Sequence, residues 1–271
     1  MKIKNVLSAA AVCAATVLAI SSCSKEQDAV APTAPAQVSP AVISQIKDMG
    51  LTTAGIQRVD GGYLVEGDIV ITDENLANKP AYQMMRVGTE EQYRTTNLVS
   101  VGSGRTITVR VSTALPSAYV TATDEAIRRY NAQNLLVRFT RVTSGGNIVM
   151  NQAPSGSSYL ASAGFPSGGN PYYQVLVNSG AIGTANASTY IATILSHEMG
   201  HCIGFRHTDY MDRSYSCGGA YSNEGASTVG AIQIPGTPSG PDAGSWMLAC
   251  IGSGQNRYFN TNDVTALRYV Y

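Results

Sequence analysis

HEMGHCIGFRH, at residues 197–207, holds all three histidines of this 271-residue chain. On an α-helix, His197 and His201 lie one turn apart on the same face, about 6 Å along the axis. Both can therefore direct a ring nitrogen at one metal ion. Gly204 permits a sharp turn that other residues resist, and such a turn brings His207 back as a third ligand. Three histidines and one open position are typical of a catalytic zinc (Zn²⁺) site, whereas structural zinc sites are closed.

Glu198 directly follows the first expected ligand, about 100° round the helix from it. It therefore cannot lie on the line that joins His197 and His201, and it is placed to act as a base. It would accept the proton of a zinc-bound water and pass it to the leaving group. A purely structural zinc site needs no base here, so Glu198 favours an enzyme. The alternatives are a non-catalytic surface-binding protein that contains zinc, and a metal-dependent amidase acting on something other than protein.

The pattern H-E-x-x-H-x-x-G-x-x-H resembles the signature of the metzincin zinc peptidases. The sequence from His201 to Asp209 looks most like that of the HEIGH-type metallopeptidases, the bacterial protease B group. The resemblance runs from about Gly62 to the end of the sequence. The resemblance implies a zinc endopeptidase with an α+β fold. We therefore expect a mixed twisted sheet, a backing helix, an active-site helix, a loop-rich lower subdomain with a Met-turn, and a C-terminal helix.

The resemblance also implies roles for single residues. Met247, in the sequence Ser-Trp-Met, is the expected Met-turn residue that packs beneath the metal. Astacins and serralysins carry a tyrosine two residues later, where this chain has Ala249, so no tyrosine ligand is expected there. The stretch Tyr159, Leu160, Ala161, Ser162 and Ala163 resembles the edge strand of matrix metalloproteinases, to which an extended peptide can add as a new strand. A Gly/Ser-rich surface loop is the alternative.

Hydrophobic periodicity supports this architecture. Residues 105–111 alternate like a half-buried strand, and residues 123–132 predict a helix capped by Thr123. Two further strands are predicted at 135–142 and 147–152. An order of strand, helix, strand, strand indicates a mixed sheet with a helix packed against it.

The first 22 residues predict a lipoprotein signal peptide. Lys2 and Lys4 precede an apolar stretch at 6–20, which is shorter than the roughly 20 residues that span a bilayer. The stretch ends in small residues before Cys23, as in lipoproteins whose cysteine carries the lipid. An ordinary signal peptide with an incidental cysteine is the alternative.

Three segments are expected after the signal peptide. Residues 23–40 are a flexible tether, residues 41–97 a pro-segment or small N-terminal module, and residues 98–271 the catalytic domain. A hairpin is predicted near 55–72. Its Asp68 lies in a stretch similar to the F-x-G-D of astacin pro-segments, whose Asp occupies the open zinc position. Asp68 is therefore a candidate zymogen switch, and a glycine bulge in a solvent-facing hairpin is the alternative.

Cysteine count and charge complete the expectations. Export permits one disulfide, and we favour Cys217–Cys250, with Cys202 as a buried thiol, although connectivity does not follow from sequence. The formal net charge of zero and the lack of a basic cluster argue against nucleic acid. We expect a monomer that acts on protein or peptide substrates. It would be exported and held by its lipid at the outer membrane or surface of a bacterial cell, with release from the surface as the alternative.

Overall fold

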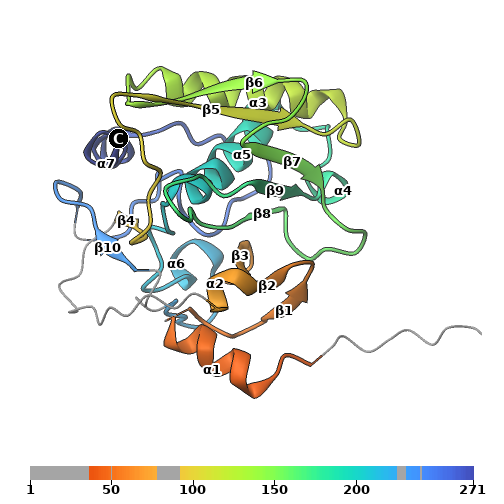
Figure 1. Ribbon diagram of the computed structural model, residues 1–271, viewed down its shortest axis with the longest axis vertical. Helices are drawn as coiled ribbons and strands as arrows, with labels where there is room; N and C mark the ends of the chain where they lie inside the picture. The colour runs from red at the N-terminus through yellow and green to blue at the C-terminus, as the bar shows by residue number, and fades with distance from the viewer. Residues whose placement is uncertain (1–36, 50, 78–91, 225–229, 239) are drawn as a thin grey trace, which may run out of the picture. The chain divides into compact units, whose positions relative to one another are not determined.

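The computed structural model describes residues 37–49, 51–77, 92–224, 230–238 and 240–271 (Figure 1). The expected signal peptide, Cys23 and most of the tether lie outside the described residues. The boundary expected between residues 97 and 98 stays a prediction. No helix in the described part of the chain is both long and apolar enough to cross a membrane.

Among the described residues, eight strands form one mixed sheet in the order β1-β2-β3-β8-β9-β7-β5-β6. Strands β9, β7, β5 and β6 run parallel to one another, whereas β8 is antiparallel to β9. The predicted mixed sheet is confirmed. The strands are β1 (Gln57–Val59), β2 (Gly62–Val65), β3 (Ile69–Thr72), β5 (Arg105–Val111), β6 (Val137–Val142), β7 (Ile148–Gln152), β8 (Ala161–Ala163) and β9 (Gln174–Val177).

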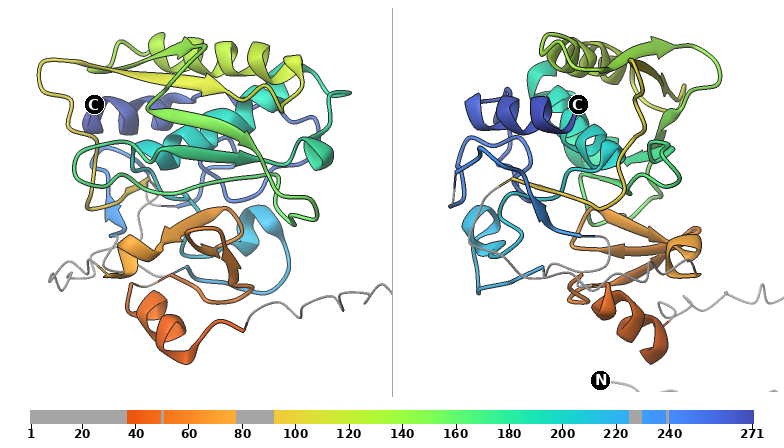
Figure 2. Two further views of the ribbon diagram at one scale, coloured as in Figure 1. Left: turned by 45° about the vertical axis from the view of Figure 1, so that its right-hand side comes forward. Right: turned by 60° about the vertical axis from the view of Figure 1, so that its left-hand side comes forward.

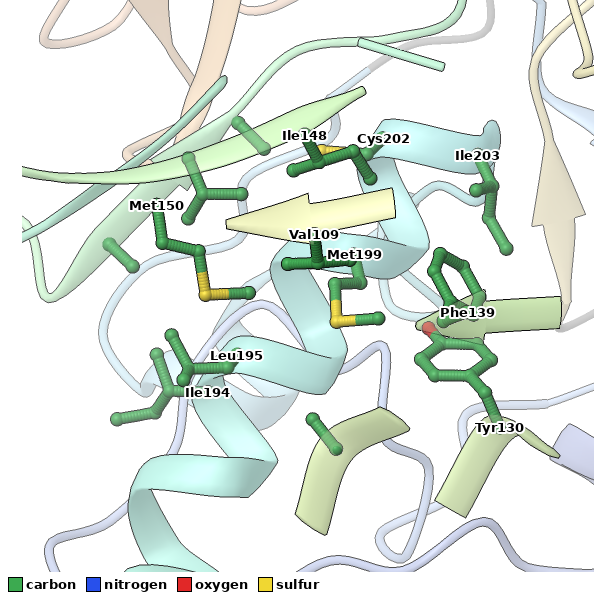
Figure 3. Packing of buried hydrophobic residues seen from close by; sticks show 14 of the residues in the cluster. Val109, Tyr130, Phe139, Ile148, Met150, Ile194, Leu195, Met199, Cys202 and Ile203 are labelled. Atoms are coloured by element: carbon green, nitrogen blue, oxygen red, sulfur yellow. The ribbon is translucent and has the colours of Figure 1, made fainter. Parts of the chain in front are cut away.

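Helices α3 (Ser117–Asn131) and α5 (Ser188–Ile203) pack side by side against one face of this sheet (Figures 1 and 2). Alternate strand residues such as Ile107 and Val109 are fully buried and share one cluster with both helices. Figure 3 shows this cluster, in which the rings of Tyr130 and Phe139 lie 4.9 Å apart. The expected backing helix and active-site helix are thereby confirmed, and the buried face of α5 is fixed by the sheet.

The backing helix begins at Ser117, ahead of its predicted start at Thr123. Thr123 is no cap, because it lies inside the helix and its hydroxyl donates to the Tyr119 carbonyl at 2.7 Å. Tyr119 and Ala122 are completely buried in the main core. Packing of these two residues extends the helix toward its N-terminus, ahead of the acidic residues that suggested its first turn. Pro116, whose φ angle is restricted, directly precedes the helix.

The N-terminal module is a three-stranded meander with two small helices, α1 (Pro40–Asp48) and α2 (Asp73–Ala77). The turn predicted at 60–62 joins β1 to β2, and a second turn joins β2 to β3. The prediction of a single two-stranded hairpin is therefore wrong, because the segment forms three strands. The module has a small core of its own, which also includes Phe165 of the main part. It is therefore packed onto the rest of the protein through apolar contacts.

Strand β8 is not at an edge in this structure, contrary to expectation. Strand β3 lies beside it in parallel, with Ile69 opposite Ala163, and the Ala163 amide donates to the Asp68 carbonyl at 2.9 Å. Of the expected edge-strand residues, Tyr159 and Leu160 precede β8, and Ala161–Ala163 form it. The N-terminal module thus occupies the side of β8 that an added peptide strand would need.

The region after α5 is dominated by loops, as expected. Its described helices and strands are the short helix α6 (Ser214–Cys217), the strand β10 (Ile232–Gln233) and the C-terminal helix α7 (Thr261–Val270). Strand β10 pairs with β4 (Tyr93–Arg94), which comes much earlier in the chain. A further short helix, α4 (Ser179–Ile182), precedes α5. Cys217 and Cys250 form the expected disulfide, and Cys202 is a free buried thiol in the core.

The Cys217–Cys250 bridge should stabilise these loops by restricting the unfolded chain. It closes a loop with a sequence separation of 33, for which chain entropy gives about 3–4 kcal/mol. The double variant C217S/C250S should lose about that much free energy of unfolding in a denaturant titration. Wild-type protein unfolded in the presence of a reductant should match the variant. An unchanged unfolding midpoint in both experiments would show that the bridge is not a stabilising element.

Candidate metal centre

Helix α5 and the turn that ends it bring the three histidines together. His197 and His201 lie on the last two turns of α5, and Gly204 ends the helix with φ 110°, in the left-handed region. A β-carbon at Gly204 would also lie 2.8 Å from the Leu98 side chain and 3.0 Å from the Asn97 carbonyl, so only glycine fits. This turn returns His207 to the face on which His197 and His201 lie, as predicted.

The Nε2 atoms of the histidines and one carboxylate oxygen face a common point. His201 Nε2 lies 3.2 Å from His207 Nε2. Asp68 Oδ2, from the turn before β3, lies 3.0 Å from His207 Nε2, 3.4 Å from His197 Nε2 and 3.9 Å from His201 Nε2. Asp68 and the three histidines are all nine-tenths or more buried. The alternative of a solvent-facing turn at Asp68 is therefore wrong.

Each histidine is oriented by a hydrogen bond from its other ring nitrogen. His197 Nδ1 lies 2.9 Å from the Trp246 carbonyl, and His201 Nδ1 lies 2.8 Å from the Phe205 carbonyl. His207 Nδ1 lies 2.9 Å from Glu224 Oε1. Carbonyl and carboxylate oxygens only accept, so each Nδ1 carries a proton, and in the neutral ring Nε2 is left to present its lone pair to a metal. This arrangement is typical of metal-ligating histidines.

The spacing of these four atoms fits a tetrahedral metal ion. Zinc binds nitrogen and oxygen ligands at about 2.0–2.2 Å, which separates two tetrahedral ligands by roughly 3.3–3.6 Å. The four ligand atoms of Asp68, His197, His201 and His207 all lie within 4.8 Å of one another. Three imidazoles and one carboxylate suit zinc better than calcium or magnesium, which prefer oxygen ligands.

Glu198 lies beside this cluster, where a base is expected. It is 3% exposed, and its Oε2 is buried without a hydrogen-bond partner among the described residues. Burial and the nearby Asp68 carboxylate raise the pKa of Glu198 well above its usual range. A divalent cation would act in the opposite direction, as would loss of Asp68. Burial opposes ionisation of Asp68 as well, but the three histidines hold the pKa of that carboxyl well below its usual range.

Met247 packs directly beneath the active-site helix, as expected for the Met-turn. A β-carbon at Gly200 would lie 2.6 Å from the Met247 sulfur, so a glycine is needed between the two ligands on α5. The Met247 carbonyl accepts from the Thr208 amide at 2.9 Å. Asp209 fixes the next part of the chain, because its Oδ1 accepts from the Ala249 amide at 2.9 Å. Both contacts tie the end of the zinc motif to the Met-turn.

The sequence analysis missed Asp263. Its carboxylate accepts from the Ser245 hydroxyl at 2.9 Å, the Trp246 amide at 3.2 Å and Gln92 Nε2 at 2.8 Å. It therefore holds the segment whose Trp246 carbonyl orients His197. The Asn260–Asp263 capping box at the start of α7 is visible in the sequence, but its reach to residue 245 is not.

Glu224 was also missed. It is the only acidic residue between Arg213 and Asp242, in a Gly/Ser-rich stretch, and this isolation was the one available signal. The structure buries Glu224 at 1% exposure between His207, Arg206 and Arg213, with the Arg213 Nε 3.0 Å away. Glu224 thus fixes the ring of the third histidine from a distant loop.

A cavity of about 220 Å³ opens next to Glu198 and His197. Tyr159, Leu160 and Ala161 line it, and so does part of the loop that follows Met247. Contact of the first three residues with a substrate stays a prediction. The histidine cluster therefore lies at the side of a pocket large enough for an amino-acid side chain.

Metal affinity should depend on Glu224. Glu224→Gln keeps the shape of the side chain but removes the charge that holds His207 in its ligating tautomer, so zinc affinity should fall about 10–100-fold. Competition with a chromophoric chelator measures this. Glu125→Gln is the matched control, because Glu125 also pairs with two arginines but lies on α3 away from the site. Equal zinc affinity in the wild type and the Glu224 variant would contradict the orienting role.

Comparisons with known proteins agree with the motif. A search of curated proteins finds no match. The crystal structure of myroilysin aligns at 16% identity over 63% of this chain and 84% of that chain, with a TM-score of 0.38. The hatching enzyme zinc-protease HCE-1 of the medaka fish Oryzias latipes aligns at 15% identity over 63% and 91%, with a TM-score of 0.34. The model of the dual-action HEIGH metallopeptidases matches residues 63–271, so the chain belongs to this family of metallopeptidases.

Proposed function

We propose that this metallopeptidase is a zinc-dependent endopeptidase, made as a latent lipoprotein, in which Glu198 is the general base. The observation that carries the proposal is the convergence of three histidine Nε2 atoms beside a buried, unpartnered Glu198 oxygen. His197, His201 and His207 would hold the zinc. A site that only stabilised the fold would need neither the buried base nor the adjoining pocket.

Zinc, when bound, lowers the pKa of water from 15.7 to about 7 and polarises a carbonyl oxygen. The rest of the chemistry falls to residues of this chain. Glu198 accepts a proton from the attacking water and donates it to the departing amine. The segment that contains Tyr159, Leu160 and Ala161 lies along the pocket and would hold an extended peptide.

The position of Asp68 supports a latent form. Its carboxylate lies within 3.9 Å of all three histidine Nε2 atoms and would take the fourth metal position. A carboxylate there leaves no place for the reacting water. Strand β3 continues from Asp68 along β8, so the same segment also covers the strand that a substrate would use. Removal of the N-terminal module would free both.

A second contact anchors the same turn. Glu66 is 1% exposed and lies 3.2 Å from the Nη2 of Arg206, which precedes the third histidine and is fully buried. Its backbone has φ 55°, a conformation that costs a non-glycine residue about 1–2 kcal/mol. Burial and the neighbouring Glu224 raise the pKa of Glu66. A neutral Glu66 would still accept a hydrogen bond from Arg206, so the contact does not require an ionised carboxylate. The turn that delivers Asp68 is thus held on both sides of Gly67.

The lipid anchor rests on the sequence alone. Small residues before Cys23, followed by a tether of Ala, Pro and Val, support an anchor that would hold the catalytic part close to a membrane surface. Seventeen residues from Ser24 to Pro40 reach at most about 55–60 Å. An anchored protease would therefore act on substrates at the cell envelope.

Glu198→Gln should lower kcat for peptide hydrolysis by about 10²–10⁴-fold, because the general base is lost while the ligands remain. Chelation should abolish the activity of the wild type, and added zinc should restore it. Glu125→Gln again serves as the control. Hydrolysis that survives Glu198→Gln would refute the mechanism. A wild type that binds zinc but cleaves no peptide, even after the N-terminal module is removed, would favour the non-catalytic alternative.

Asp68→Ala should raise the peptidase activity of the unprocessed full-length protein at least about tenfold, because the fourth metal position opens. Asp60→Ala, in an exposed turn of the same module, should leave the protein latent. Cleavage of a fluorogenic peptide, with gel analysis to confirm that no processing has occurred, measures this. A full-length Asp68→Ala protein that is as inactive as wild type, but active once the N-terminal module is removed, would show that cover of β8 and not Asp68 keeps the protein latent.

Cys23→Ser should move the protein from the membrane fraction to the soluble fraction and prevent incorporation of labelled fatty acid. Cys13→Ser, within the apolar stretch of the signal peptide, should do neither. Membrane association that persists after Cys23→Ser would point to an ordinary signal peptide and another mode of attachment.

A further inference from the structure

The cavity beside Glu198 has many apolar lining residues and two cationic ones, Arg213 and Arg257. Leu160, Ile194, Leu248 and Ile251 are among its lining residues, and Arg257 also lines it. Its volume of about 220 Å³ is below the roughly 300 Å³ at which pockets for whole small ligands begin. The cavity therefore fits a single amino-acid side chain of a bound peptide.

Arg257 is held in the lining of the cavity by contacts with α5 and with the loop after Met247. Its backbone amide donates to the Thr193 hydroxyl at 3.1 Å, and Thr193 precedes His197 by one turn of α5, about 6 Å. The guanidinium is kept in place because Nη1 donates to the Cys250 carbonyl at 2.9 Å. Cys250 is in turn held by the disulfide to Cys217. The cation is thus part of a fixed wall.

Arg257 is half-buried and takes part in none of the ion pairs formed by the described residues. Burial lowers its pKa, which shows that the charge is poorly solvated. Within the described residues its guanidinium donates to two neutral acceptors, Cys250 O and Gln255 Oε1, which leaves donors available. The carboxylates of Asp209 and Asp263 attract this charge without forming an ion pair or hydrogen bond with it, because their oxygens bind other groups. A carboxylate that enters the cavity can therefore stabilise the partly desolvated cation by direct contact.

The other charged groups of the cavity do not satisfy Arg257. Arg213 lines it near Gly67 but is already paired with Glu224 at 3.0 Å. Glu198 and Asp68 lie at the end with the histidines, and Asp68 would leave with the N-terminal module. Without Asp68, Glu198 is the only carboxylate among the described lining residues, beside Arg213 and Arg257.

We propose that this cavity selects an acidic side chain, with glutamate preferred, in a residue that flanks the cleaved peptide bond. The methylene groups would contact Leu160, Ile194 and Leu248, and the carboxylate would receive hydrogen bonds from Arg257. Lysine or arginine at the same position would be repelled by Arg257. The inference rests on the proposed endopeptidase function and assigns Arg257 as the residue that determines specificity.

A pair of peptides that differ only in Glu or Gln beside the cleaved bond tests the proposal. The background is the full-length protein with Asp68→Ala, and the measured quantity is the ratio of kcat/KM for the two peptides. We expect at least about tenfold preference for Glu. Arg257→Gln, which can still donate to Cys250, should bring the ratio close to one, and Arg257→Glu should favour a Lys peptide. Arg268→Gln, at an exposed position on α7, should change nothing.

The outcomes separate the pocket from the chemistry. A folded Arg257→Gln protein with an undiminished Glu preference, or a parent protein with no Glu preference, overturns the proposal. Failure to cleave any peptide, or cleavage that survives Glu198→Gln, contradicts the proposed function instead. If the Arg257 variants do not fold, binding of the two peptides to the Asp68→Ala/Glu198→Gln protein decides, and equal affinities overturn the proposal.

Discussion

The metal centre depends on the hydrogen bonds that orient its three histidines from their Nδ1 atoms. The acceptors are the Trp246 carbonyl, the Phe205 carbonyl and the Glu224 carboxylate, from three different segments. The motif therefore supplies the ligands, while the loops supply their orientation. Because a carbonyl cannot donate, these bonds also select the tautomer that leaves Nε2 for the metal. A zinc ion can be held only when the loops that follow α5 are folded.

This dependence explains why several charged side chains are buried among the loops that follow α5. Asp263, on α7, accepts a hydrogen bond from the Trp246 amide in the Met-turn, and Asp209 accepts one from the Ala249 amide just after it. Arg206 and Arg213 compensate the charge of Glu224. The disulfide then closes the same region. These hydrogen bonds, ion pairs and the disulfide restrict the loops around the metal centre to one conformation. They also restrict the part of the pocket lining that contains Arg257.

The parts that the sequence predicts are those set by short-range patterns. The helical ligands, the turn at Gly204 and the alternating strands all follow from spacing within a few residues. The start of α3 was misplaced because burial of Tyr119 and Ala122, and not the cap signal at Thr123, extends the helix. Glu224 and Asp263 could not be found, since their partners lie 17 and 18 residues away or more and no period connects them. The position of β8 was wrong for a similar reason, because β3 arrives beside it from a segment about ninety residues earlier.

In the proposed latent form, Asp68 is the residue through which the N-terminal module would contact the metal. The most direct measurement is an anomalous difference map, recorded at the zinc edge, from crystals of the unprocessed protein grown with zinc. The account predicts one peak at about 2.0–2.2 Å from the Nε2 atoms of His197, His201 and His207 and from an oxygen of Asp68. A peak without the three histidines, or a zinc ion whose fourth ligand is water while Asp68 points elsewhere, would contradict it.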